Sequence, residues 1–246
     1  MVSARTADQS ATRPKNKLLL ALPPASFRRL QPDLKTIPTR TKQVFYNQGQ
    51  PLEFVYFPNG GVLSITTVLA DGTMVETATV GNEGMVGIEA LLSDNPVAPG
   101  MTMMQVPDTD AERLSVKAFR LEMARGEALA IMMGRYAQTV FRQMMQSSAC
   151  NALHHVTERC PRWLLMTHDR VEGDSFELSQ EFLAVMLGVR RQSVSVVAHT
   201  LQTAGLITYR HGRVTVLDRA GLEAAACECY AALRDPPDAR PAVTVR

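Results

Sequence analysis

Apolar and polar positions recur with helical spacing between residues 179 and 201. Ser179 stands before a first apolar series and Gly188 ends it, since serine caps helix starts and glycine tolerates the positive φ of a sharp turn. A second series recurs at spacings of three and four, which predicts one buried helix face. Its members are Val194, Val197, Ala198 and Leu201. The pattern therefore predicts two short helices packed as a helix-turn-helix.

Two short apolar runs follow, at residues 207–209 and 214–217, and they flank the pair His211-Gly212. A tight turn between two β-rich runs is typical of a hairpin. A hairpin directly after a helix-turn-helix indicates a wing.

Between residues 42 and 106 the pattern changes to short β-rich runs separated by turn clusters rich in Gly, Pro, Asn and Asp. Their spacing of roughly ten residues is typical of an antiparallel barrel or roll. The expected strands are residues 44–46, 54–57, 62–68, 74–80 and 101–106.

Residues 127–153 contain no proline and carry an apolar stripe at helical spacing, which predicts one long helix. The stripe consists of Leu129, Met133, Tyr136, Val140, Met144 and Ser147 or Ser148. We interpret it as a face that pairs with a second copy of the chain, in preference to a face that only packs on the β-roll. Another amphipathic helix is expected over residues 155–168, with Trp163 buried.

The outward face of the second short helix is polar, and its surroundings are basic. The whole chain has a formal net charge of only +2, yet no Asp or Glu occurs from Phe182 to Leu217, an interval that holds four arginines. A local basic patch favours a phosphate backbone, Arg191 suits guanine, and Gln192 suits adenine. The expected DNA-binding residues are Ser179, Gln180, Arg190, Arg191, Gln192, Ser193, Ser195 and His199. Within this set, Gln192 and Ser195 lie beside Arg191, and Ser179, Gln180 and His199 are positioned for phosphates.

These segments resemble the Crp/Fnr transcription regulators. The similarity lies in residues 178–184 and 187–195, in Gly205-Leu206-Ile207 and Gly212-Arg213, and, in the sensor half, in residues 55–58 and 80–87. The resemblance implies an α+β chain with an N-terminal antiparallel β-roll of the cyclic-nucleotide-binding type, a long dimerisation helix and a C-terminal winged helix-turn-helix. It also implies a homodimer on a near-palindromic stretch of double-stranded DNA, with RNA polymerase as an open further partner.

The expected organisation follows from the pattern and the resemblance together. It comprises a disordered arm (1–17), a β-roll sensor domain (18–126), the dimerisation helix (127–153), the winged helix-turn-helix domain (154–230) and a flexible tail (231–246). A chain with 46% hydrophobic residues can form ordinary cores. No apolar run approaches the roughly 20 residues of a membrane span, and none forms a secretory signal, so a cytoplasmic protein without membrane contact is expected.

The sensor half departs from the cyclic-nucleotide-binding members of the family. Their ribose-binding glutamate corresponds to Ile88, their phosphate-binding Arg-Ser pair to Ala98-Pro99, and their adenine-binding polar pair to Met144-Met145. No arginine occurs from Thr41 to Glu112 to hold a cyclic phosphate. We therefore expect a signal other than cyclic AMP; the alternative is a constitutive regulator with a purely structural β-roll.

Metal and cofactor chemistry is not expected. The first 149 residues contain neither Cys nor His, which excludes a cupin-type metal centre and argues against an N-terminal iron-sulfur cluster. Cys227 and Cys229 form the only close cysteine pair, for which a structural or incidental role is favoured over a redox or metal switch. The pair His154-His155 is expected to border an interdomain junction.

No catalytic motif occurs, and we expect no enzyme. A small-molecule-binding β-barrel enzyme would need a carboxylate such as Glu76 or Glu89, but both are expected to be surface or turn residues. A third alternative is a scaffold whose helix-turn-helix binds protein. Members of the resembled family commonly have glutamate and arginine where this chain has Gln192 and Val196, which predicts a different half-site.

Overall fold

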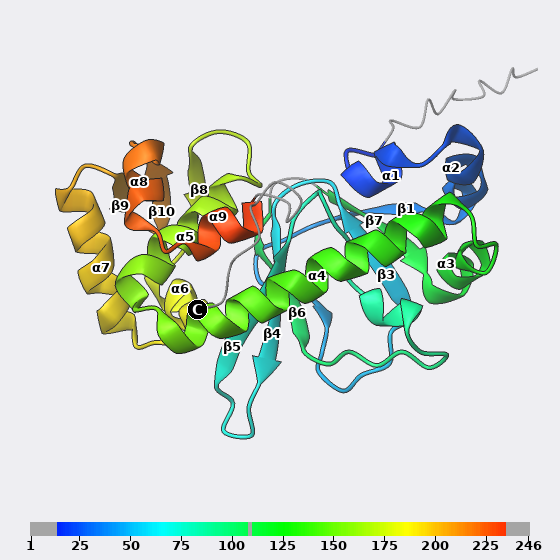
Figure 1. Ribbon diagram of the computed structural model, residues 1–246, viewed down its shortest axis with the longest axis horizontal. Coiled ribbons are helices and arrows are strands. Elements are labelled where there is room, and N and C mark those ends of the chain that lie inside the picture. Colours follow the sequence, from blue (N-terminus) through cyan, green and yellow to red (C-terminus); the bar gives the residue numbers. More distant parts are fainter. Residues whose placement is uncertain (1–13, 108–109, 235–246) are drawn as a thin grey trace, which may run out of the picture.

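A long helix, α4 (Ala128–Leu153), organises the molecule in the computed structural model, which describes residues 14–107 and 110–234 (Figure 1). Helices α1 (Lys17–Ala21) and α2 (Pro24–Leu30) lie at one end, and the C-terminal domain lies at the other. The β-sheets lie between them against α4. The predicted α+β arrangement of β-roll, long helix and winged helix-turn-helix is confirmed.

Two antiparallel sheets form the N-terminal half, with strand orders β1-β7-β3 and β2-β6-β4-β5. The strands are β1 (Lys35–Pro38), β2 (Val44–Tyr46), β3 (Phe54–Pro58), β4 (Val62–Val68), β5 (Met74–Val80), β6 (Met101–Val106) and β7 (Asp110–Ser115). The five predicted strands are β2 to β6. The sequence pattern missed β1, because most of it is exposed, and β7, because charged residues alternate with its buried Ala111 and Leu114.

Short helical segments precede, separate and follow these strands. The 3-10 turn η1 (Gln31–Asp33) leads into β1, η2 (Ile88–Leu91) lies between β5 and β6, and α3 (Val116–Met123) follows β7. The core of this half contains fully buried Val55 and Phe57 from β3, together with side chains of α1, α3 and α4.

The expected disordered arm, residues 1–17, ends in folded structure. Asn16 is fully buried, and its amide Nδ2 donates to the carbonyl oxygens of Pro58 and Gly84, both at 2.8 Å. Its Oδ1 accepts the N–H groups of Leu18 and Leu19, so it caps α1. For residues 14–17 this prediction was wrong, because Pro58 and Gly84, the partners that bury Asn16, are distant in sequence; residues 1–13 lie outside the described residues.

The apolar stripe of α4 faces the β-roll. Leu129, Met133 and Val140 are buried in the core of the N-terminal half, and the Tyr136 hydroxyl donates to the carbonyl oxygen of Met85 at 2.7 Å. The interpretation of this stripe as the pairing face was therefore wrong. Helical spacing reveals a buried face, but it does not reveal which partner buries it.

The C-terminal domain comprises five helices and a small sheet of order β8-β10-β9. Its elements are α5 (Val156–His168), β8 (Ser175–Glu177), α6 (Gln180–Leu187), α7 (Arg191–Thr203), β9 (Ile207–Arg210), β10 (Arg213–Val216), α8 (Arg219–Ala225) and α9 (Cys229–Arg234). The hairpin β9–β10 was predicted and β8 was not. Val62 and Val106 of the β-roll belong to the same core as this domain, so the two halves are in close contact.

Residues 235–246 of the expected tail lie outside the described residues, and α9 occupies its first positions. Among the helices that are described, none has the length and apolar character needed to cross a membrane.

Candidate DNA-binding site

The turn between α6 and α7 has the geometry that its sequence predicts. The Ser179 hydroxyl accepts the N–H of Phe182 at 3.2 Å, which caps α6. Gly188 ends the helix at φ 62°, a left-handed conformation that glycine adopts without strain. The predicted inward face of α7 is buried, as are Leu183 and Ala184 of α6. Packing against α6 therefore holds α7 in place, while the other face of α7 is exposed to solvent.

The exposed face of α7 carries the side chains expected to contact DNA. Arg190, Arg191, Gln192 and His199 are exposed, and Ser193 is half-buried. Arg191 forms a loose ion pair with Glu181, with 4.0 Å between Nε and Oε2 and both side chains in solvent. Such an exposed pair contributes little, so the guanidinium can exchange it for a base or phosphate.

Ser195 and Gln180 are bound to each other. The Ser195 hydroxyl donates to Oε1 of Gln180 at 2.6 Å, joining α7 to the start of α6. In this state Ser195 has no free proton for a base edge, whereas the Gln180 amide nitrogen can still donate to a phosphate. The sequence pattern did not indicate this contact because the two residues are 15 positions apart.

The wing extends the same face. His211 and Gly212 both have positive φ, 50° and 73°, as a two-residue hairpin turn requires. The Tyr209 hydroxyl donates to the carbonyl oxygen of Leu178 at 2.7 Å, which fixes the wing beside the start of α6. A hollow of about 450 Å³ lies between α6, α7 and the wing tip. The exposed Arg210 stands at the wing tip, next to the turn.

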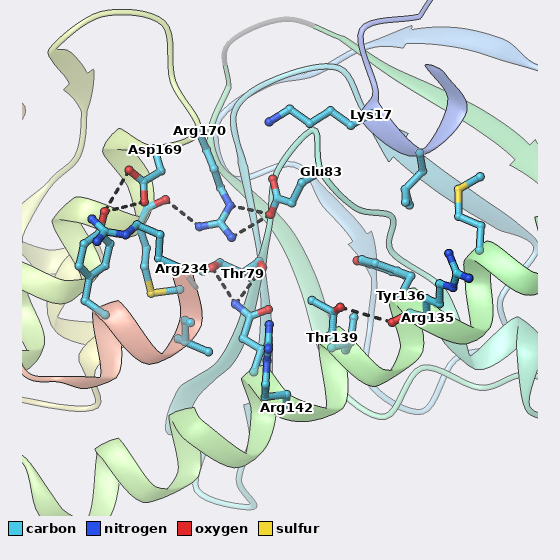
Figure 2. Close-up of a pocket in the computed structure, with 17 residues that line it drawn as sticks. Lys17, Thr79, Glu83, Arg135, Tyr136, Thr139, Arg142, Asp169, Arg170 and Arg234 are labelled. Atoms are coloured by element: carbon cyan, nitrogen blue, oxygen red, sulfur yellow. Dashed lines mark hydrogen bonds and ion pairs between the residues drawn. The ribbon is translucent and has the colours of Figure 1, made fainter. Parts of the chain in front are cut away.

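A second candidate site is a cavity of about 580 Å³ between α1, the β-roll, α4 and the C-terminal domain (Figure 2). Its charged lining residues are Lys17, Arg135, Arg142, Arg170 and Arg234, against Glu83 and Asp169 among the described residues. The Arg170 Nε donates to Glu83 at 2.8 Å, which joins the C-terminal domain to the β-roll. Nothing in the sequence indicated this cavity, because its walls come from five separate segments of the chain.

Glu76 is not a surface residue, contrary to expectation. It is 9% exposed, and the N–H of Trp163 in α5 donates to its Oε1 at 3.0 Å. Ser64 and Gln105 donate to its other oxygen. Burial raises the pKa of this carboxyl to about 7, although the hydrogen bonds and the charge of Arg162 act in the opposite direction. Glu89 lies in the 3-10 turn η2, half-buried.

Solved structures with the same fold are transcription regulators. FixK2 from Bradyrhizobium japonicum has a TM-score of 0.65 and 19% identity over 79% of this chain and 98% of that one. The c-di-GMP responsive global regulator CLP from Xanthomonas campestris has a TM-score of 0.63 and 18% identity, over 78% and 98%. A CRP-family regulator from Thermus thermophilus has a TM-score of 0.62 and 23% identity, over 78% of this chain and 96% of that one. No curated protein sequence matches the chain.

The C-terminal domain also matches a family by sequence: residues 158–225 fit the Crp-like helix-turn-helix domain. This part of the chain is a Crp-like helix-turn-helix domain. The match contains α6, α7 and the wing, so the exposed face described above belongs to a Crp-like domain. The prediction of a helix-turn-helix domain of the Crp type is confirmed by this match, and the predicted β-roll and long helix agree with the shared fold.

Proposed function

We propose that this Crp/Fnr-type protein is a homodimeric, sequence-specific transcription regulator that binds a near-palindromic operator. The observation that carries the proposal is the exposed polar face of α7, held by the capped α6 and flanked by a basic wing. Two such helices related by a twofold axis would enter successive major grooves about 34 Å apart. The proposal places the protein in the cytoplasm, with RNA polymerase as an expected further partner.

The residues divide by the part of DNA that they would contact. Arg191 is the candidate for guanine, with Gln192 beside it. Ser179, Gln180 and His199 are the candidates for binding backbone phosphates. Arg190 and Ser193 lie at the start of α7 and complete the surface. Ser195 would contact DNA only after releasing Gln180.

Arg191→Ala tests the assignment to DNA. If Arg191 reads a base, operator affinity falls by about 1 to 3 kcal/mol and discrimination at one base pair is lost. Fluorescence anisotropy on duplexes selected from a random pool measures both quantities. Arg28→Ala, which removes the same charge from exposed α2, is the matched control. Equal binding by wild type and Arg191→Ala would refute this role, and selection of the common family half-site would refute the effect assigned to Gln192 and Val196.

Dimerisation is supported by the outer face of α4. Seven exposed positions on it recur at alternating spacings of three and four, a heptad-like seam. They are Ile131, Gly134, Gln138, Phe141, Met145, Ser148 and Ala152. Phe141 is 67% exposed and Met145 60%, and large apolar side chains in such a row favour burial against a second copy. This outer face replaces the inner stripe as the proposed contact.

A signal would act where the β-roll meets the C-terminal domain. The basic cavity of Figure 2 lies at this junction, and the Nε of its Arg142 is buried without a hydrogen-bond partner among the described residues. A buried, unpaired N–H is unfavourable, and an anion would satisfy it. We therefore extend the proposal to a small anionic effector, distinct from the family's cyclic-nucleotide site.

Native mass spectrometry of the purified dimer tests the effector. We expect an added mass that is lost after denaturation and reduced in Arg142→Ala but retained in Arg28→Ala. Absence of any added mass, combined with unaltered operator binding by Arg142→Ala, would favour the constitutive regulator with a structural β-roll.

A further inference from the structure

Four potential metal ligands meet where the long helix joins the C-terminal domain. Cys150 and His154 lie at the end of α4, and Cys227 and Cys229 lie where α8 leads into α9. Their ligand atoms all lie within 4.8 Å of one another. The three cysteines are buried and pack as a cluster of their own. The fourth cysteine of the chain, Cys160, belongs to a different core.

The distances fit a tetrahedral site. The sulfurs of Cys150 and Cys227 are 3.6 Å apart, and the sulfur of Cys229 is 3.4 Å from Nδ1 of His154. Ideal zinc bonds to sulfur and nitrogen place two sulfur ligands about 3.8 Å apart, and a sulfur and a nitrogen ligand about 3.6 Å apart. Two of the six ligand–ligand distances are therefore close to those of a zinc tetrahedron, and all six are within 4.8 Å.

Local backbone structure brings each pair of ligands together. Cys150 and His154 are four residues apart, and the N–H of His154 donates to the Cys150 carbonyl at 3.1 Å, so both side chains leave the same face of the helix end. The N–H of Cys227 donates to the carbonyl of Glu158 in α5 at 3.3 Å. This bond fixes the Cys-x-Cys segment against the first turns of α5.

The surroundings suit a negatively charged metal centre. Zn²⁺ with three thiolates and a neutral imidazole carries a net charge of −1. Arg159 and Arg162 are buried and act electrostatically on Cys150, and among the described residues neither forms an ion pair with a carboxylate. The Gln146 amide donates to the Cys229 sulfur at 3.0 Å, as outer hydrogen bonds to metal-bound thiolates do. The two arginines would thus compensate the negative charge of the metal centre, and Gln146 would donate a hydrogen bond to one of its thiolates.

We propose that Cys150, His154, Cys227 and Cys229 bind one Zn²⁺ as a structural site. The metal replaces two thiol contacts with four bonds and fastens α9 to the end of α4, beside which α9 already lies. Because α4 carries the proposed dimer seam and α9 belongs to the DNA-binding domain, the site fixes the position of α7 relative to the dimer axis. The sequence favoured a structural or incidental role for the Cys-x-Cys pair over a metal or redox switch, and the proposal makes that role structural through a bound metal.

Metal content of the full-length protein tests the site. Purified under reducing conditions, the wild type is expected to hold about one zinc per chain by plasma mass spectrometry. Cys227→Ser and His154→Gln lose this equivalent, whereas Cys160→Ser and His155→Gln, the matched controls beyond the cluster, retain it. Zinc retained in both ligand variants would overturn the proposal.

Cobalt provides a readout that needs no variant. Wild-type protein stripped with a chelator in the presence of reductant and titrated with Co²⁺ should develop visible ligand-field bands and sulfur-to-cobalt charge transfer, saturating at one equivalent and displaced by Zn²⁺. Absence of these bands would overturn the proposal, as would a Cys150–Cys227 disulfide found as the resting state by peptide mass spectrometry. These measurements do not depend on DNA binding, so the proposed metal site can be refuted without refuting the proposed regulator function, and the reverse.

Discussion

Glu76 combines burial with an incomplete hydrogen-bond network. Its carboxylate receives three donors, from Ser64, Gln105 and Trp163, while Oε1 of Gln105 is buried without a partner. A neutral carboxyl would be a donor as well as an acceptor, and rotating the Gln105 amide would let its oxygen accept that proton. The raised pKa, about 7 against an ordinary 4.5, agrees with a site that favours the neutral acid.

We predict that Glu76 makes the folded state less stable as the pH rises. The unfolded carboxyl loses its proton near pH 4.5 and the folded one near 7, so stability falls across that window by about 3 kcal/mol. Glu76→Gln removes this dependence, because a glutamine amide can keep the Trp163 bond and donate to Ser64 and a rotated Gln105. Denaturant titrations from pH 5 to 8 at fixed protein concentration measure the difference. Glu53→Gln, at an exposed position, should follow the wild type, and an unchanged slope in Glu76→Gln would contradict the prediction.

The sequence predicted residues well where their role is local. Ser179 and Gly188 act within their own turn, and both behave as their residue types indicate. Glu76 and the metal-ligand cluster depend on contacts between distant segments: Trp163 is 87 positions from Glu76, and Cys227 is 77 positions from Cys150. The spacing of apolar residues gives no information on contacts between distant segments, so the burial of these residues and their partners could not be predicted.

Helix α4 has two apolar faces with different uses. The inner stripe has the stronger signal because it packs on the β-roll, and Leu129 and Met133 are almost fully buried there. The outer seam is weaker in sequence, since Gly134, Gln138 and Ser148 interrupt it. Burial also decided which strands could be predicted. The buried strands β4 and β5 have strong apolar patterns, whereas the exposed β1 does not.

We predict that Phe141→Glu disrupts the dimer. A twofold axis along the seam would place the two new carboxylates opposite each other, which weakens dimerisation by about 3 kcal/mol, or more than about 100-fold. Sedimentation velocity over a range of concentrations measures the shift to monomer. Leu121→Glu, a similar change at an exposed position of α3, should remain dimeric. If Phe141→Glu associates as tightly as the wild type, the contact lies elsewhere.

The charge of the whole molecule contributes little to DNA affinity. With a formal net charge of +2, the protein has no general attraction to a phosphate backbone, so binding must depend on the arginines around α7 and the wing. Of the wing arginines, Arg213 pairs with Glu177 at 3.2 Å, whereas Arg210 forms no ion pair with any described residue. Contacts between the halves, such as that of Arg170 with Glu83, connect this basic surface to the rest of each subunit.

Arg210→Ala should therefore reveal how many subunits bind DNA. A phosphate contact adds about 0.9 to the slope of log affinity against log salt, so loss of one contact in each of two subunits lowers the slope by about 1.8. Affinity should fall by a similar factor on operator and unrelated duplexes, unlike the sequence-dependent loss expected for Arg191→Ala. Anisotropy titrations between low and moderate salt measure the slope, with Arg28→Ala expected to match the wild type. A change of about 0.9 would mean that one subunit contacts the duplex, against the proposed symmetric complex.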